Sequence, residues 1–129
     1  MPRRLEESPS ELALAVATGD ADWRRLKDLG FSLRKVRGGW RGTHSPPTPV
    51  VVPVTATLLA AGLVRYSARP RELQPWAVSM LGADCFDFAP LEDHIAGTLL
   101  LDALWDIAQT GVISPTALDA ATRLGERTP

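Results

Sequence analysis

The chain has 129 residues, of which 45% are hydrophobic and 22% charged, and its formal net charge is −1. This length suits one globular domain that buries its own core. No apolar run reaches the roughly 18 residues of a membrane span. The N-terminal arginines are followed directly by acidic residues, a pattern that does not fit a signal peptide. The single cysteine excludes an internal disulfide. We therefore expect a soluble, cytoplasmic protein with no membrane partner and one domain, residues 1–129.

The first 30 residues predict a helical hairpin. Ser8 and Glu11 have the spacing of a capping box, which begins a helix. Gly19 can end this helix in the left-handed conformation. Asp20 is expected to cap a second helix over residues 21–29, where apolar side chains recur at helical spacing: Trp23, Leu26 and Leu29.

A β-hairpin is predicted to follow from Phe31. Two short runs flank the pair Gly38-Gly39, and glycine tolerates the positive φ that tight hairpin turns require. The next segment, residues 44–53, contains four prolines, which lack a backbone N–H. It is expected to be a loop or extended connector, with Val50–Val52 as a candidate edge strand.

Residues 54–66 predict a short helix that leads into a strand. Thr55 can cap the helix, Gly62 is expected to close it, and residues 63–66 are expected to form the strand. The following segment, 67–90, has no assigned structure, because its prolines interrupt the pattern. Within it, the run QPWAVSML suits either a short helix or a strand.

The C-terminal part, residues 91–125, predicts an acidic helical pair. A long amphipathic helix over residues 91–110 ends at Gly111, and Ser114-Pro115 begins a second helix that ends at Gly125. The apolar set of the first helix is predicted to be Ile95, Leu99, Leu101, Leu104, Trp105 and Ala108. The predicted fold class is α+β, a small mixed domain with an N-terminal helical hairpin, short wing-like strands and a C-terminal helical pair.

The small net charge conceals a separation of charge along the chain. Residues 31–75 carry seven cations against Glu72 alone, a net of +6, whereas residues 76–129 carry two cations against eight acids, a net of −6. Such separation is typical of a surface that faces a polyanion, although both blocks can also face water and neutralise each other in the fold. The candidate binding cations are Arg34, Lys35, Arg37, Arg41, Arg65, Arg69 and Arg71.

The pattern T-x-x-L-x-x-x-G-L-V-R resembles the passage from recognition helix to strand in winged helix-turn-helix proteins; its residues here are Thr55, Leu58, Gly62, Leu63, Val64 and Arg65. The resemblance covers about residues 20–70 and implies a basic winged-helix-like centre over residues 31–71 that binds nucleic acid. The chain departs from this family because its hairpin precedes the helix. The helix also offers only Thr55 and Thr57 as polar side chains, so backbone contacts are expected without base readout.

No enzyme, cofactor or metal site is predicted. Only His44 and His94 are present, without a Cys-x-x-Cys or His-x-x-x-His pair, so the ligands of a zinc site are too few. Cys85 lies between two acids that raise a thiol pKa, which favours buried filler over a nucleophile. Gly38-Gly39 lacks the Lys-Ser/Thr of a phosphate-binding loop.

The four tryptophans have different predicted roles. Trp23 and Trp105 are expected in the core, because both lie on apolar helical faces, and Trp76 has no assigned role. Trp40 stands among the cations, where its ring can stack on an unpaired base or pack against the first helices. Core packing is the favoured role of Trp40.

Two functions fit the sequence. The leading hypothesis is a non-enzymatic, regulatory nucleic-acid-binding protein that contacts backbone phosphates through the seven cations, with Trp40 among the site residues. The alternative is a protein-interaction module, such as a phage or mobile-element inhibitor of a nucleic-acid-handling defence complex, whose basic face meets an acidic protein surface. The acidic C-terminal helices can also bind a basic partner or the basic centre of a second copy.

Overall fold

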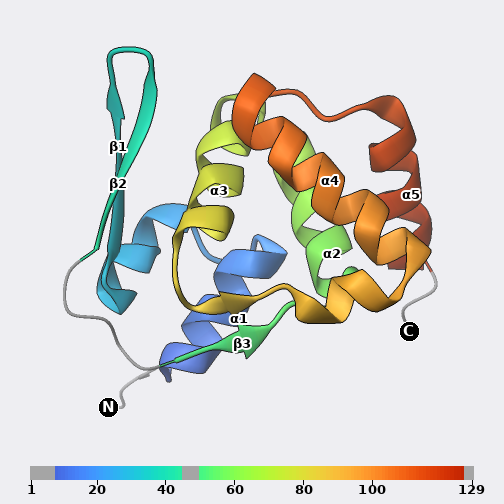
Figure 1. Ribbon diagram of the computed structural model, residues 1–129, viewed down its shortest axis with the longest axis horizontal. Helices are drawn as coiled ribbons and strands as arrows, with labels where there is room; N and C mark the ends of the chain where they lie inside the picture. The colour runs from blue at the N-terminus through green and yellow to red at the C-terminus, as the bar shows by residue number, and fades with distance from the viewer. Residues whose placement is uncertain (1–7, 45–49, 127–129) are drawn as a thin grey trace.

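The computed structural model describes residues 8–44 and 50–126, which form a mixed α+β domain (Figure 1). The predicted fold class is confirmed. The N-terminal half comprises α1 (Pro9–Thr18), the 3₁₀ helix η1 (Trp23–Leu29), β1 (Phe31–Val36), β2 (Gly39–His44), β3 (Val52–Pro53) and α2 (Ala56–Ser67). The C-terminal half comprises α3 (Pro70–Gly82), β4 (Phe86–Asp87), the 3₁₀ helix η2 (Ala89–Asp93), α4 (Ile95–Thr110) and α5 (Pro115–Glu126).

The ends of α1 follow the local signals of the sequence. The hydroxyl of Ser8 accepts a hydrogen bond from the Glu11 amide at 3.2 Å, and the Glu11 carboxylate accepts one from the Ser8 amide at 2.9 Å. Gly19 ends the helix with φ +86°. Asp20 does not cap the next element as predicted, because its carboxylate is bound by the Thr18 hydroxyl and by Arg65. Asp22 caps η1 instead, which is a 3₁₀ helix and not the predicted α-helix.

The prediction of a strand over residues 63–66 was wrong, because α2 continues through Gly62 to Ser67. The buried side chains along α2, Leu59, Leu63 and Tyr66, keep the three-to-four spacing of one helical face. Gly62 lets this face approach its neighbours, because a Cβ at this position would collide with the Ala17 carbonyl oxygen. Gly62 therefore serves the packing of α2 and does not end the helix.

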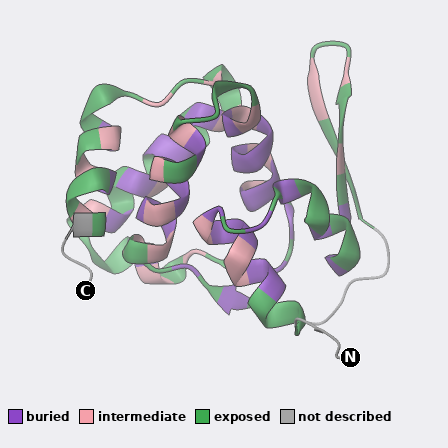
Figure 2. Ribbon diagram, turned by 180° about the vertical axis from the view of Figure 1, so that it is seen from behind, coloured by how far each residue is buried: buried purple, intermediate pink, exposed green. Residues whose placement is uncertain are grey.

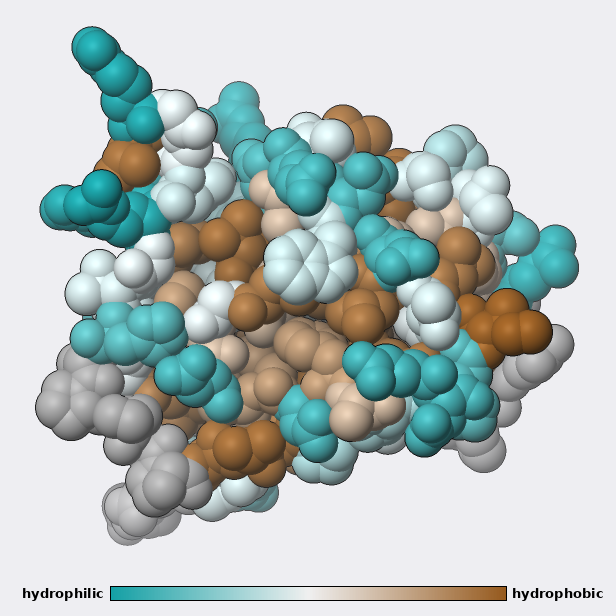
Figure 3. All heavy atoms as spheres, viewed as in Figure 1, coloured by the Kyte–Doolittle hydropathy of each residue, from teal (hydrophilic) through white to brown (hydrophobic). Residues whose placement is uncertain are grey.

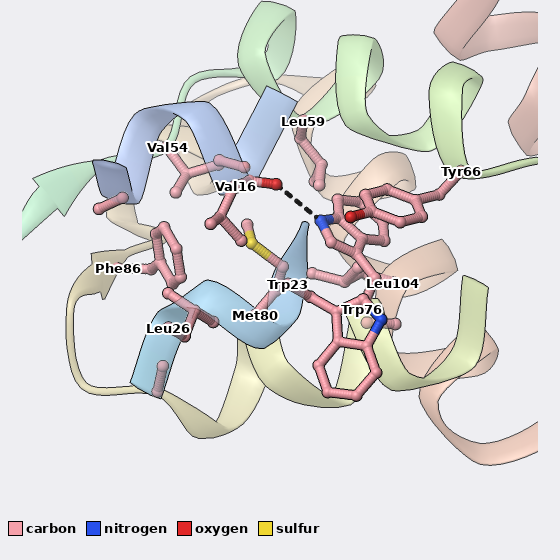
Figure 4. Close-up of a cluster of buried hydrophobic side chains, with 14 of the residues drawn as sticks. Val16, Trp23, Leu26, Val54, Leu59, Tyr66, Trp76, Met80, Phe86 and Leu104 are labelled. Carbon is pink, nitrogen blue, oxygen red and sulfur yellow. Dashed lines mark hydrogen bonds between the residues drawn. The ribbon is translucent and has the colours of Figure 1, made fainter. Parts of the chain in front are cut away.

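The segment 67–90, which had no assigned structure, supplies the centre of the core. Its helix α3 includes Pro75 and the fully buried Trp76. The Trp76 indole donates a hydrogen bond to the Val16 carbonyl at 2.9 Å and stacks on the Tyr66 ring at 4.9 Å between centroids (Figure 4). Downstream, Phe86 pairs in parallel with Val52, so the short strand begins at Val52 and not at Val50 as predicted.

The prediction of one helix over residues 91–110 was also wrong, because the chain forms η2 and then begins α4 at Ile95. A Cβ at Gly97 would collide with the backbone of Leu91, so this side of α4 must face η2. The helical repeat then turns Leu100, Leu104 and Ile107 into the core. Trp105, predicted in the core, is consequently 53% exposed.

The helices surround a common core, and the hairpin of β1 and β2 stands at its side (Figures 1 and 2). Figure 2 shows buried residues concentrated in the helical body, whereas the distal half of the hairpin is exposed or half-buried. At the C-terminus, Gly111 ends α4 with φ +79° as predicted, while α5 continues through Gly125 to Glu126. The hairpin is therefore an arm that extends from a closed helical domain.

Candidate nucleic-acid interface

The register of the hairpin gives it two chemically different faces. Phe31 pairs with His44, Arg34 with Arg41 and Lys35 with Trp40, and successive side chains along a strand point to opposite faces. The inner face, toward η1 and α3, carries Phe31, Leu33, Lys35, Trp40, Gly42 and His44. The outer face carries Ser32, Arg34, Val36, Arg41 and Thr43.

The root of the hairpin is fixed to the end of α3. The buried Phe31 ring meets the His44 ring at 5.1 Å, and His44 Nε2 lies 3.0 Å from the Gly82 carbonyl oxygen. Gly42 is required beside this pair, because a Cβ there would lie 2.7 Å from the Phe31 ring. The strands are therefore held at one fixed distance from α3 at this end.

Trp40 anchors the part of the hairpin near its turn to the body. Its indole N–H donates to the Gln74 side-chain oxygen at 3.4 Å, and its ring meets the Trp23 ring edge-on at 6.0 Å. Lys35 places its ammonium group 5.5 Å from the centre of the Trp40 ring. Gln74 in turn donates to the Ala108 carbonyl at 3.1 Å, so the anchor extends to α4. Trp40 is thus partly buried against the core, as favoured from the sequence.

A carboxylate from α3 supports this anchor from the other side of Trp23. Glu72 accepts a hydrogen bond from the Trp23 indole at 2.9 Å and one from Arg24 at 2.6 Å. The Arg24 guanidinium also lies 4.4 Å from the centre of the Trp23 ring. Hydrogen bonding from Arg24 lowers the pKa of Glu72 below its ordinary value. No local sequence signal points to Arg24 and Glu72, because they lie 48 positions apart.

The outer face of the hairpin concentrates unneutralised positive charge. Arg34 lies directly opposite Arg41, and like charges at such positions destabilise a strand pair. Arg37 occupies the turn, followed by Gly38 with φ +88°. Within residues 8–44 and 50–126, none of these arginines, nor Lys35, forms an ion pair. The hairpin therefore presents four cations with no acidic partner from the described part of the chain.

The remaining predicted site residues lie on α2 and α3. Arg65 is bound to the Asp20 carboxylate at 2.6 Å, and Arg69 lies 5.5 Å from the centre of the Tyr66 ring. Arg71 is exposed on α3, one helical turn before Gln74, the residue that holds Trp40. The fold therefore groups the hairpin residues of the predicted site, whereas Arg65 and Arg69 contact Asp20 and Tyr66 away from the hairpin.

The candidate chemical groups outside the hairpin have ordinary structural surroundings. Cys85 is buried, as predicted, and burial raises the pKa of its thiol to about 11. In the ranges that the structure describes, no three His, Cys, Asp or Glu side chains gather as metal ligands. The same ranges contain no helix with the length and apolar character of a membrane span.

No model of a protein family, no curated protein and no solved structure matches the chain.

Proposed function

We propose that the protein binds nucleic acid without catalysing a reaction, by seating backbone phosphates against the outer face of the β1–β2 hairpin. The observation that supports this proposal is the cross-strand pair of Arg34 and Arg41, which has no acidic partner among the described residues. A phosphate between the two guanidinium groups would offset their repulsion and accept hydrogen bonds from both. Arg37 at the turn extends the same charged surface.

The composition of this face suits contact with phosphates. Its arginines bind phosphate and can also pair with guanine, whereas the other side chains are Ser32, Val36 and Thr43, and the Asn and Gln that pair with adenine are absent from it. On the opposite, inner face of the hairpin, the Trp40 side chain is held by Gln74 and Trp23. We infer an affinity for duplexes of many sequences, which suits a regulatory or accessory role in handling nucleic acid.

A salt titration tests this function directly. Binding of a fluorescently labelled DNA duplex of two helical turns is followed by anisotropy at several salt concentrations. Each phosphate contact contributes about −0.9 to the slope of log K against log salt, so contacts by Arg34, Arg37 and Arg41 give about −2.7. Absence of binding at low salt would contradict the proposal.

Paired variants show whether the hairpin makes these contacts. Arg34→Gln with Arg41→Gln removes two cations from the exposed outer face and is expected to reduce the slope by about 1.8. Arg123→Gln in α5 removes an exposed cation elsewhere and should leave the slope unchanged. An equal loss of affinity for each cation removed in the two variants would indicate attraction by overall charge and would exclude the hairpin as the site.

A second candidate function, protein interaction, is favoured by a separate observation. Ile95, Leu99 and Trp105 are exposed on α4, where large apolar side chains gather without a partner from the described part of the chain. The acidic residues and the hollows around these apolar side chains indicate what kind of partner this surface binds.

A further inference from the structure

The outward face of α4 combines apolar and acidic side chains. Ile95 is 92% exposed, Trp105 53% and Leu99 37%, and the helical repeat places all three on the side that also carries Asp102 and Asp106. Figure 3 shows hydrophobic surface across this side of the molecule, interrupted by hydrophilic atoms. Scattered apolar residues are normal on a surface, but three large ones on one helical face are typical of a contact site.

The surface is also hollowed. A groove of about 480 Å³ runs between η2 and the start of α4, and a second hollow of about 340 Å³ lies between α4 and α5. Leu99 and Asp102 line both hollows, so the two are adjacent, and together they are named here the α4 groove. Its lining residues used below are Glu92, Asp93, Ile95, Leu99, Asp102 and Asp106.

The charge of the α4 groove specifies a basic occupant. Its four acids form no ion pair within the described ranges, and neither hollow is lined by a lysine or arginine. The sequence itself contains no Lys or Arg between Arg71 and Arg123. A complementary ligand therefore supplies several cations together with some apolar surface.

We propose that the α4 groove receives the β1–β2 hairpin of a second copy of this chain. The hairpin offers three outward arginines, Arg34, Arg37 and Arg41, to the acids of the groove, and the half-buried Val36 lies beside its turn. A chain cannot fill its own groove in this way, because the hairpin and the η2 end of α4 lie at opposite sides of the molecule (Figures 1 and 2). The net charge of −1 leaves almost no overall repulsion between copies, so the local attraction dominates their approach.

The contact joins two different surfaces of the chain, the hairpin of one copy and the groove of another. Reciprocal exchange of hairpins closes a two-fold dimer, whereas one-way insertion builds an open chain of molecules. Both forms depend on screened charge pairs and weaken as salt is added. The inference requires no nucleic acid and stands apart from the proposed function in its test.

Sedimentation velocity without nucleic acid measures the association. The wild-type protein is expected to associate at low salt and to become monomeric at high salt. Two charge-reversed variants test the surfaces: Asp102→Lys with Asp106→Lys in the groove, and Arg34→Glu with Arg41→Glu on the hairpin. All four side chains are exposed, so the fold tolerates the changes. Each variant alone is expected to associate at least tenfold more weakly than the wild type.

Mixing the two variants gives the decisive result. The acidic hairpin of one variant then faces the basic groove of the other, so association is expected to return in the mixture. Asp28→Lys with Asp119→Lys makes the same change in net charge outside the groove and should leave wild-type association unchanged. A monomeric wild type at low salt overturns the inference, as does a mixture that stays monomeric. Association that is lost with Leu99→Asp yet insensitive to salt and to both charge reversals would indicate groove-to-groove contact and also overturn it.

Discussion

Gly62 illustrates how a missing side chain determines the packing of three helices. It lies in the buried face of α2, where a Cβ would collide with the Ala17 carbonyl of α1 and lie 2.5 Å from the Trp76 ring of α3. Neither neighbour can move easily, because one is backbone and the Trp76 indole is held by its hydrogen bond to Val16. The close approach of α1 and α3 to α2 therefore depends on this one glycine.

We predict that Gly62→Ala destabilises the protein by about 2 kcal/mol or more, since overpacking a filled core usually costs about 1–3 kcal/mol. Urea unfolding followed by tryptophan fluorescence measures the loss. Gly125→Ala is the matched control, because a Cβ there meets no atom within 4 Å and α5 continues through it. That control should be neutral or stabilising by up to about 1 kcal/mol. Equal stability of both variants would show that α1 and α3 can separate from α2 without cost.

At the scale of elements, the ion pair of Arg24 in η1 with Glu72 in α3 supports Trp23, the residue against which the hairpin packs. The Glu72 carboxylate holds the Trp23 indole, and the Trp23 ring meets Trp40. Arg24 shields the other side of Trp23 and lowers the pKa of Glu72. These contacts connect three segments far apart in the sequence. A change at Glu72 is therefore expected to weaken the packing of Trp40 of the hairpin.

Glu72→Gln is predicted to lower the free energy of unfolding by about 1 kcal/mol at neutral pH, because it removes a partly exposed, charge-assisted contact. The folded pKa of Glu72 is lowered, so its stabilisation is present above the ordinary value of 4.5 and is lost as pH falls through the folded pKa. The difference between variant and wild type should therefore shrink below pH 4.5, as measured by urea unfolding at several pH values. Asp28→Asn, which changes an exposed acid in η1, the 3₁₀ helix that carries Arg24, is the control and should change the free energy of unfolding little. A constant difference across pH would assign the effect to packing alone.

The same elements show which features the sequence could predict. The start of α1 at Ser8, its end at Gly19 and the hairpin turn at Gly38 depend on residues within a few positions, and all were found. The continuation of α2 through Gly62 depends on the Ala17 carbonyl, far away in the chain, and was missed. The exposure of Trp105 was missed for a similar reason, because contact with η2 sets the rotation of α4.

The same distinction between local and long-range signals applies to the candidate site. Its hairpin cations are neighbours in the sequence, so composition alone brought them together as a group. The ion pair of Arg65 with Asp20 and that of Arg24 with Glu72 connect distant segments, and no local pattern reveals them. The α4 groove depends on which face of the helix is left uncovered, a property that only the packed fold defines.

For the whole molecule, the separation of charge links the two proposed contacts. The hairpin would serve both the phosphates of a duplex and the α4 groove of a second copy, with the same arginines in each. Two ligands that occupy one site exclude each other, and each weakens the other by the same factor. A duplex is therefore a competitor of self-association.

We predict that a short duplex, long enough for one hairpin only, dissociates the self-associated protein at low salt. Sedimentation velocity with a dye on the duplex should show one chain per duplex at saturation and a matching loss of protein complexes. Added salt of equal ionic strength controls for screening, and Arg34→Gln with Arg41→Gln should bind both the duplex and the second copy more weakly than the wild type. Exposed apolar contacts give a second control: Ile95→Ser with Leu99→Ser keeps the charge unchanged, weakens self-association and leaves duplex binding intact. Complexes with two chains on one short duplex at saturation would contradict the prediction, because the hairpin would then be free to bind both partners at once.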